Sequence, residues 1–246
     1  FVASLSLAMI FSGALGIQAV AISPRDMPVY LVFLMSATML VLLVACGFFA
    51  AELKQASEIL LVRATGRPPK LSLADDKRWH LFLSHNWANQ DVVATIKRQL
   101  QLLLPGVRVF LDVEDLDSID QLEDYVARSQ ALLLLLGSLQ YFGSANCMRE
   151  LCTARELGLP LIVVHDADEA KGGAPLKALQ GACRSHARSR AAYDYAFAAG
   201  REPIPWHRIT PFQLVTLRQV AEQLLLACPG RAPAAAAALT LPGERH

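Results

Sequence analysis

The chain has 246 residues, of which 54% are hydrophobic and only 18% are charged, and its formal net charge is +1. An average globular chain has roughly 45–50% apolar and about 25% charged residues, so this composition excludes an intrinsically disordered protein and argues against a wholly soluble one. A net charge so close to zero gives no electrostatic case for nucleic-acid binding, which normally needs a strongly basic face.

Most of the apolar excess lies near the N-terminus. Within residues 1–51, the only charged side chains lie in the short segment 23–28. The runs 1–22 and 29–51 are free of charge, and each exceeds the roughly 20 helical residues that cross a ~30 Å hydrocarbon core. Because the segment between them is long enough only for a tight turn, we expect a transmembrane helical hairpin over residues 1–51 that contacts the lipid bilayer.

A secretory signal peptide is the alternative interpretation of the first apolar run. Such a peptide opens with a positively charged segment, which this run lacks. The chain also begins with Phe1, so we expect it to be a piece of a longer protein.

The flanks of the hairpin predict its orientation. The turn carries one arginine, whereas four basic residues follow the second run, namely Lys54, Arg63, Arg67 and Lys70. Positive charges near membrane helices stay on the cytoplasmic side, so we expect a multi-pass membrane protein with its C-terminal part in the cytoplasm. The cysteines form no CxxC pair and no zinc-spaced set with histidine, as is typical of free thiols in a reducing compartment.

The segment 52–77 is expected to be a juxtamembrane helix followed by a linker. Apolar residues at helical spacing continue to about residue 65, and Pro68 and Pro69 then stop the helix. A domain boundary is therefore expected near residue 78.

Residues 78–228 alternate strand patterns with amphipathic helical patterns. The strands are expected near 79–84, 107–111, 131–136, 160–165 and 203–206. This alternation predicts an α/β fold with a doubly wound parallel sheet, whose ligands bind beyond the carboxyl ends of the strands. The low-complexity segment 229–246, with five consecutive alanines, is expected to be a disordered tail.

An acidic segment follows the second predicted strand, and one interpretation of it is a calcium-binding loop. Counted from Asp112, the sixth position of such a loop must be glycine and the fifth must supply an oxygen ligand. Those positions hold Asp117 and Leu116, which excludes a calcium site, and no other metal site is expected. The acids either stabilise a helix N-terminus from a solvated loop or form a protein contact surface.

Motifs of other α/β proteins are missing from the strand ends. A phospho-acceptor receiver needs an acidic pair after the first strand and an aspartate after the third, where this chain has Ser84-His85 and Gly137-Ser138. Neither a nucleotide-binding glycine motif nor a GxSxG nucleophile elbow is present.

Several short sequences, taken in order, resemble the Toll/interleukin-1 receptor (TIR) domain. They are Trp79-His80-Leu81-Phe82-Leu83-Ser84-His85, Asp91, Val109-Phe110-Leu111-Asp112, Asp115-Leu116, Ser129 with the strand 132–136, Tyr141-Phe142, Ser144, Cys147 and Glu150-Leu151. The resemblance covers residues 78–165 well and 203–227 loosely. It implies a flavodoxin-like strand order and, with the membrane helices in front, looks most like TIR-type domains of large protist or algal membrane proteins.

The resemblance also implies two kinds of site. In the TIR family the loop after the second strand contacts other TIR domains, and here that loop includes Asp112, Glu114, Asp115, Leu116 and Asp117.

In members that cleave NAD, a glutamate early in the third helix is catalytic, and Glu150 matches it. A carboxylate there stabilises the oxocarbenium-like centre that forms when the nicotinamide–ribose bond breaks. Ser84, His85 and Trp87 lie where NAD would be held. The alternative for Glu150 is an ordinary first-turn acid favoured by the helix dipole.

Three functions remain open from the sequence. The main hypothesis is a membrane-anchored signalling protein whose TIR-like domain associates with other TIR domains or with a second copy of itself. The second is an NAD-cleaving enzyme, with NAD as its substrate, that self-association activates. The third, a regulatory domain of a channel or transporter, is the least favoured because the apolar runs contain no charge.

Overall fold

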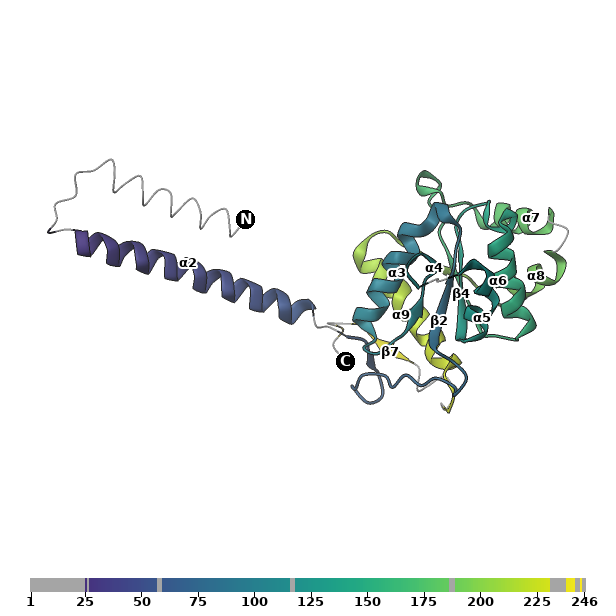
Figure 1. Cartoon of the computed structure of the whole chain (residues 1–246), viewed down its shortest axis with the longest axis horizontal. Coiled ribbons are helices and arrows are strands. Elements are labelled where there is room, and N and C mark those ends of the chain that lie inside the picture. Colours follow the sequence, from purple (N-terminus) through teal and green to yellow (C-terminus); the bar gives the residue numbers. More distant parts are fainter. Residues whose placement is uncertain are drawn as a thin grey trace. The chain divides into compact units, whose positions relative to one another are not determined.

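The computed structural model describes residues 25, 27–56, 59–115, 118–185, 189–230, 238–241 and 244. The chain divides into two compact units, Phe1–Glu58 and Ile59–His246. The second unit contains all the described strands, and Figure 1 labels several of its elements.

In the first unit the described residues form the helix α2 (Met27–Ala56). Its segment Met27–Ala50 has a mean hydropathy of 2.5 and no buried residue, so it is long and apolar enough to cross a membrane. A helix of this composition near an N-terminus is either a membrane anchor or a signal sequence. It covers the expected span 29–51, whereas the expected span 1–22 lies outside the described residues. The described part of the chain therefore holds one candidate span where the sequence predicted two.

The second unit is built on a five-stranded parallel sheet in the order β3-β2-β4-β5-β6. Its strands are β2 (Trp79–Ser84), β3 (Val109–Phe110), β4 (Ser129–Leu136), β5 (Leu161–His165) and β6 (Ile204–Pro205). This order is the flavodoxin-like one, and it confirms the α/β fold that the alternating pattern predicts.

Helices cover both faces of the sheet, as Figure 1 shows. One apolar cluster joins the sheet to α3 (Gln90–Leu103) and α9 (Thr210–Ala227). The other joins it to α5 (Leu122–Ala127), α6 (Ala145–Glu156), α7 (Leu176–Ser185) and α8 (Ser189–Ala196). Because both faces are covered, the five consecutive leucines of β4 are all buried.

Short helical turns complete the second unit. The four-residue helix α4 (Asp112–Asp115) follows β3. The 3-10 turns are η1 (Trp87–Asn89), η2 (Ile119–Gln121), η3 (Tyr141–Gly143) and η4 (Glu169–Lys171).

The folded unit begins earlier than the expected boundary at residue 78. The helix α2 ends at Ala56 instead of continuing to residue 65, and Leu60 and Val62 are buried in the core shared with α3 and α9. Leu60 and Val62, which the sequence pattern assigned to a juxtamembrane helix, therefore belong to the core of the sheet domain.

The expected disordered tail also contains structure. The strand β7 (Leu239–Thr240) pairs antiparallel with β1 (Leu61–Val62), and Leu239 is buried in the same core. This pairing joins residues almost 180 positions apart, so no local pattern in the alanine-rich tail could indicate it.

Candidate functional site

The candidate site lies where the carboxyl ends of the parallel strands meet. Ser84 is the last residue of β2 and pairs with Leu134 of β4. Its Oγ donates a hydrogen bond to Glu150 Oε2 at 2.5 Å and also lies 2.5 Å from the hydroxyl of Tyr141. The structure therefore brings Ser84 and Glu150 into direct contact, although 66 positions separate them in the chain.

The position of Glu150 follows from how α6 begins. Ser144 is the N-cap of the helix, and its Oγ accepts a hydrogen bond from the Cys147 backbone amide. The first turn of α6 contains no acidic residue. Glu150 therefore lies too far along the helix for its carboxylate to be stabilised by the dipole at the helix N-terminus, which was the alternative interpretation of this residue. Its side chain is turned into the protein and only 5% of the residue is exposed.

The environment of Glu150 favours its neutral form. Burial is the main cause that raises the pKa of its carboxyl to about 8, and the negative charge of Asp112 adds to this, while the Ser84 hydrogen bond and Arg149 oppose it. Glu150 is therefore mostly protonated at neutral pH.

The thiol beside this carboxyl is also held neutral. Burial raises the pKa of Cys147 to about 12, and its Sγ donates to the backbone carbonyl of His85 at 3.2 Å. The hydroxyl of Tyr141 also reaches the Cys147 carbonyl at 3.4 Å, and burial raises the pKa of this phenol well above its usual value. Because a nucleophilic cysteine must be a thiolate, Cys147 serves packing and hydrogen bonding.

Tyr141 was missed as a site residue in the sequence analysis. It lies in η3, soon after the end of β4. Two signals in the sequence pointed to it, its place in the Tyr141-Phe142 pair of the TIR-like pattern and its position in a loop at the carboxyl edge.

The other two residues of the predicted NAD-binding loop have different surroundings. The imidazole of His85 is buried, with its Nδ1 3.9 Å from Asp112 Oδ1; burial lowers its pKa against the opposing effect of Asp112. Trp87 in η1 is 72% exposed. In this loop, Ser84 and His85 are therefore buried, whereas the indole of Trp87 lies at the surface.

The acidic segment after β3 is partly tied to the sheet domain. The ammonium of Lys97 binds Asp115 at 2.6 Å and Glu114 at 2.8 Å, and Asp115 also accepts a hydrogen bond from the Leu111 amide. The side chain of Glu114 remains exposed to solvent. The predicted contact residues Leu116 and Asp117 lie outside the described residues.

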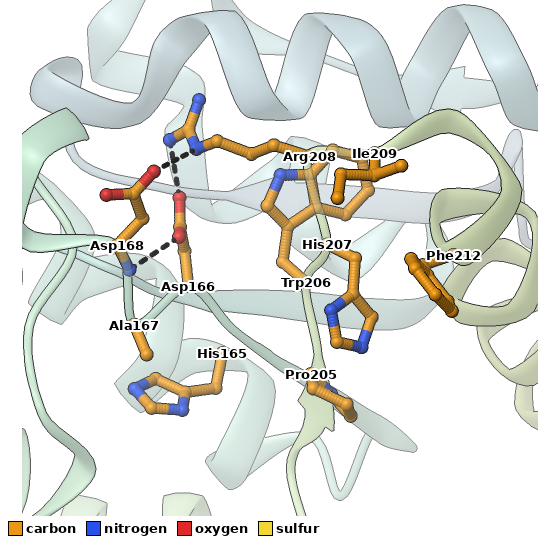
Figure 2. A pocket seen from close by; sticks show the side chains of 10 residues that line it. All are labelled: His165, Asp166, Ala167, Asp168, Pro205, Trp206, His207, Arg208, Ile209 and Phe212. Atoms are coloured by element: carbon orange, nitrogen blue, oxygen red, sulfur yellow. Dashed lines mark hydrogen bonds and ion pairs between the residues drawn. The ribbon is translucent and has the colours of Figure 1, made fainter.

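A second polar cluster lies at the same edge, at the ends of β5 and β6. Arg208 binds the fully buried Asp166 at 2.7 Å and approaches Asp168 at 3.3 Å, and it also reaches Asp91 on α3 at 3.4 Å. Figure 2 shows its guanidinium held between Asp166 and Asp168.

A cavity of about 390 Å³ lies beside this cluster. It is also lined by Trp206, His207 and Phe212 (Figure 2). The charged groups at its wall are engaged with one another, so we assign the cluster a structural role. The sequence gives one local signal for this cluster, an aspartate immediately after a predicted strand.

Within the described ranges, no group of three or more His, Cys, Asp or Glu side chains is placed to hold a metal ion.

Comparison with known proteins finds one family model that matches part of the second unit. The family model for the TIR domain matches residues 81–195, a range that runs from β2 into α8 and includes Ser84, Tyr141 and Glu150. No curated protein matches the chain.

Proposed function

Because the family model for the TIR domain matches residues 81–195, we propose that this chain is a signalling protein whose sheet domain associates with other TIR domains, in the first place with a second copy of itself. The single observation that carries this proposal is the exposure of large apolar side chains in the turns, loops and first helical turn that follow the strands at the carboxyl edge of the sheet. These are Trp87 after β2, Leu139 after β4, and Ile209 and Phe212 after β6. Exposed apolar groups at one edge of the sheet favour association, because contact with a partner removes them from water.

Self-association of the segment 59–246 is expected to depend on this edge. We expect sedimentation velocity to show dimers or larger species as the concentration rises. Trp87→Asp and Phe212→Asp should each weaken association at least tenfold, because a charge buried at an interface is costly. Leu102→Asp is the matched control, since Leu102 is equally apolar and exposed but lies at the C-terminal end of α3. A strict monomer at high concentration would overturn the proposal.

We further propose that α2 anchors the chain in a membrane, with the sheet domain in the cytoplasm. The length and apolar composition of α2 support the anchor. The basic residues that follow it, Arg63, Arg67 and Lys70, support the orientation.

Cleavage of NAD is the second candidate function, and the contact between Ser84 and Glu150 at the carboxyl edge favours it. An ionised carboxylate is needed beside the ribose to stabilise an oxocarbenium-like centre. In this fold Glu150 is buried and mostly protonated, so the isolated domain lacks that carboxylate. Association would have to open the site and let NAD reach Ser84, His85 and Trp87.

Nicotinamide release therefore should depend on both clustering and pH. We expect no release by the dilute segment 59–246. When the segment is clustered on a multivalent scaffold, release should rise as the pH increases toward 8, because deprotonation creates the Glu150 carboxylate. Glu150→Gln in the same clusters should abolish release. Equal release by the clustered wild type and by this variant would leave association as the only function supported.

A further inference from the structure

Asn89 departs from the usual behaviour of a residue at the start of a helix. It ends η1 and is the N-cap of α3. An asparagine at this position normally accepts a hydrogen bond from an amide of the helix that follows, but the side chain of Asn89 makes no capping bond. The carboxamide of this side chain is therefore engaged elsewhere.

The side chain of Asn89 reaches across to the loop after β4. Its Oδ1 accepts a hydrogen bond from the backbone amide of Ser138 at 2.9 Å, 49 positions away in the chain. Gly137 lets the two loops come this close, because a Cβ at this position would lie 2.7 Å from both Oδ1 and Nδ2 of Asn89. The contact thus needs an asparagine on one loop and a glycine on the other.

This contact between the two loops has a local cost. Asn89 is only 1% exposed, and its buried Nδ2 has no hydrogen-bond partner among the residues that the structure describes. A buried donor without a partner lowers stability, and α3 also lacks the side-chain cap that Asn89 could supply. Departures of this kind from the local rules are expected where a function requires them. The arrangement therefore points to a role beyond stability.

The two loops that the contact joins carry exposed apolar side chains. Trp87 lies two positions before Asn89 and is 72% exposed, and Leu139 follows Ser138 directly and is 50% exposed. Both belong to the edge that is proposed above to self-associate. The hydrogen bond between Asn89 and Ser138 therefore fixes the two loops from which these side chains project.

We propose that Asn89 is a positioning residue, which holds Trp87 and Leu139 in the arrangement that a second copy of the chain recognises. Side chains and loops that are already in place lose less conformational entropy when a partner binds. Without the hydrogen bond, the two loops would have to be ordered during association, which weakens it. The inference rests on the proposed self-association.

The test measures self-association of the segment 59–246, which contains the residues of both apolar clusters, by sedimentation velocity. Asn89→Ala should weaken association about fivefold, the equivalent of one hydrogen bond, and should speed hydrogen exchange at the Ser138 amide. Gly137→Ala should have the same effect, because its methyl group displaces the Asn89 side chain. In the double variant the two losses should not add, since alanine at position 89 leaves room for the methyl group.

Ser129→Ala is the matched control for a loss of stability. The Oγ of Ser129 is buried and donates to the Tyr125 carbonyl at 2.9 Å, but Ser129 lies at the opposite end of β4. This variant should lower the melting temperature, as Asn89→Ala should, and should leave self-association unchanged.

Three results would overturn the inference. Unchanged association in folded Asn89→Ala, or in Gly137→Ala if the first variant does not fold, would show that the contact does not position the loops. Equal weakening by Asn89→Ala and Ser129→Ala would identify lost stability as the cause. Additive losses in the double variant would show that the two residues act separately. These results leave the proposed self-association intact, whereas a strictly monomeric wild type would overturn both proposals.

Discussion

Glu150→Gln is expected to stabilise the sheet domain strongly at pH 9 and to leave its stability unchanged below pH 4.5. The wild-type carboxyl has a pKa of about 8 in the folded protein against 4.5 as its ordinary value. Ionisation is therefore harder in the folded state. The stability that the neutral group provides is complete below pH 4.5 and is lost as the pH rises to about 8. Glutamine keeps the shape and remains neutral throughout.

The difference in the free energy of unfolding at pH 9 should reach about 4 kcal/mol, which corresponds to a melting temperature raised by roughly 10 °C. Thermal unfolding of the segment 59–246 across pH 4–9 measures it. The matched control is Glu123→Gln, because the half-exposed Glu123 binds Arg149 at 2.6 Å and this bond lowers its pKa. The control should show no gain at high pH. A constant difference between wild type and Glu150→Gln at every pH would contradict the burial of an ionisable group.

Arg208→Leu should lower the free energy of unfolding of the same segment by about 3 kcal/mol. Removing one partner of a buried ion pair leaves the other charge uncompensated, which typically costs 3–5 kcal/mol. A value near the lower limit is expected, because the side chain of Arg208 is partly exposed while that of Asp166 is buried. Chemical denaturation at pH 7 measures the loss.

Two further variants separate the charge effect from lost packing. Adding Asp166→Asn to Arg208→Leu should recover much of the stability, because asparagine still accepts the hydrogen bond from the Asp168 amide without a charge. Arg128→Leu breaks the exposed pair with Asp124 and should cost less than about 1 kcal/mol. Equal losses in Arg208→Leu and Arg128→Leu would show that the cluster at the ends of β5 and β6 is not a structural ion pair.

The two predictions concern neighbouring parts of one edge that behave differently. The carboxyl of Glu150 is bonded to neutral groups, Ser84 and through it Tyr141, so burial opposes its ionisation. The carboxylate of Asp166 has a guanidinium 2.7 Å away, so its charge is compensated. The first carboxyl can change its charge near neutral pH, as an activated enzyme would require, and the second holds two strand ends together.

The fold could be predicted from the sequence because its signal is local and repeated. Buried strands such as β4 and the three-and-four spacing of apolar residues in α3 appear within single windows of the chain. The boundaries were less well predicted. Leu60 and Leu239 pack in the same core, but they come from segments that look like a linker and a tail.

Part of the candidate site could also be predicted, because short sequence patterns mark some of its residues. The resemblance to the TIR domain identified Ser84 and Glu150, and the structure brings them together. The resemblance included Tyr141 in its pattern without giving it a role, and it did not predict that the indole of Trp87 is largely exposed while Glu150 is buried. The direction of a side chain depends on the neighbours that pack around it, and those neighbours come from several strands and helices.

The sequence by itself determined the class of the domain, the order of its elements and an apolar helix in front of it, because periodicity and composition are properties of neighbouring residues. Only the tertiary structure decided which ionisable side chains are buried and which of them form ion pairs. It buried Glu150 against Ser84 and paired Asp166 with Arg208 across 42 positions. Burial and electrostatic partners depend on distance in space, and distance in space is set only when the sheet assembles.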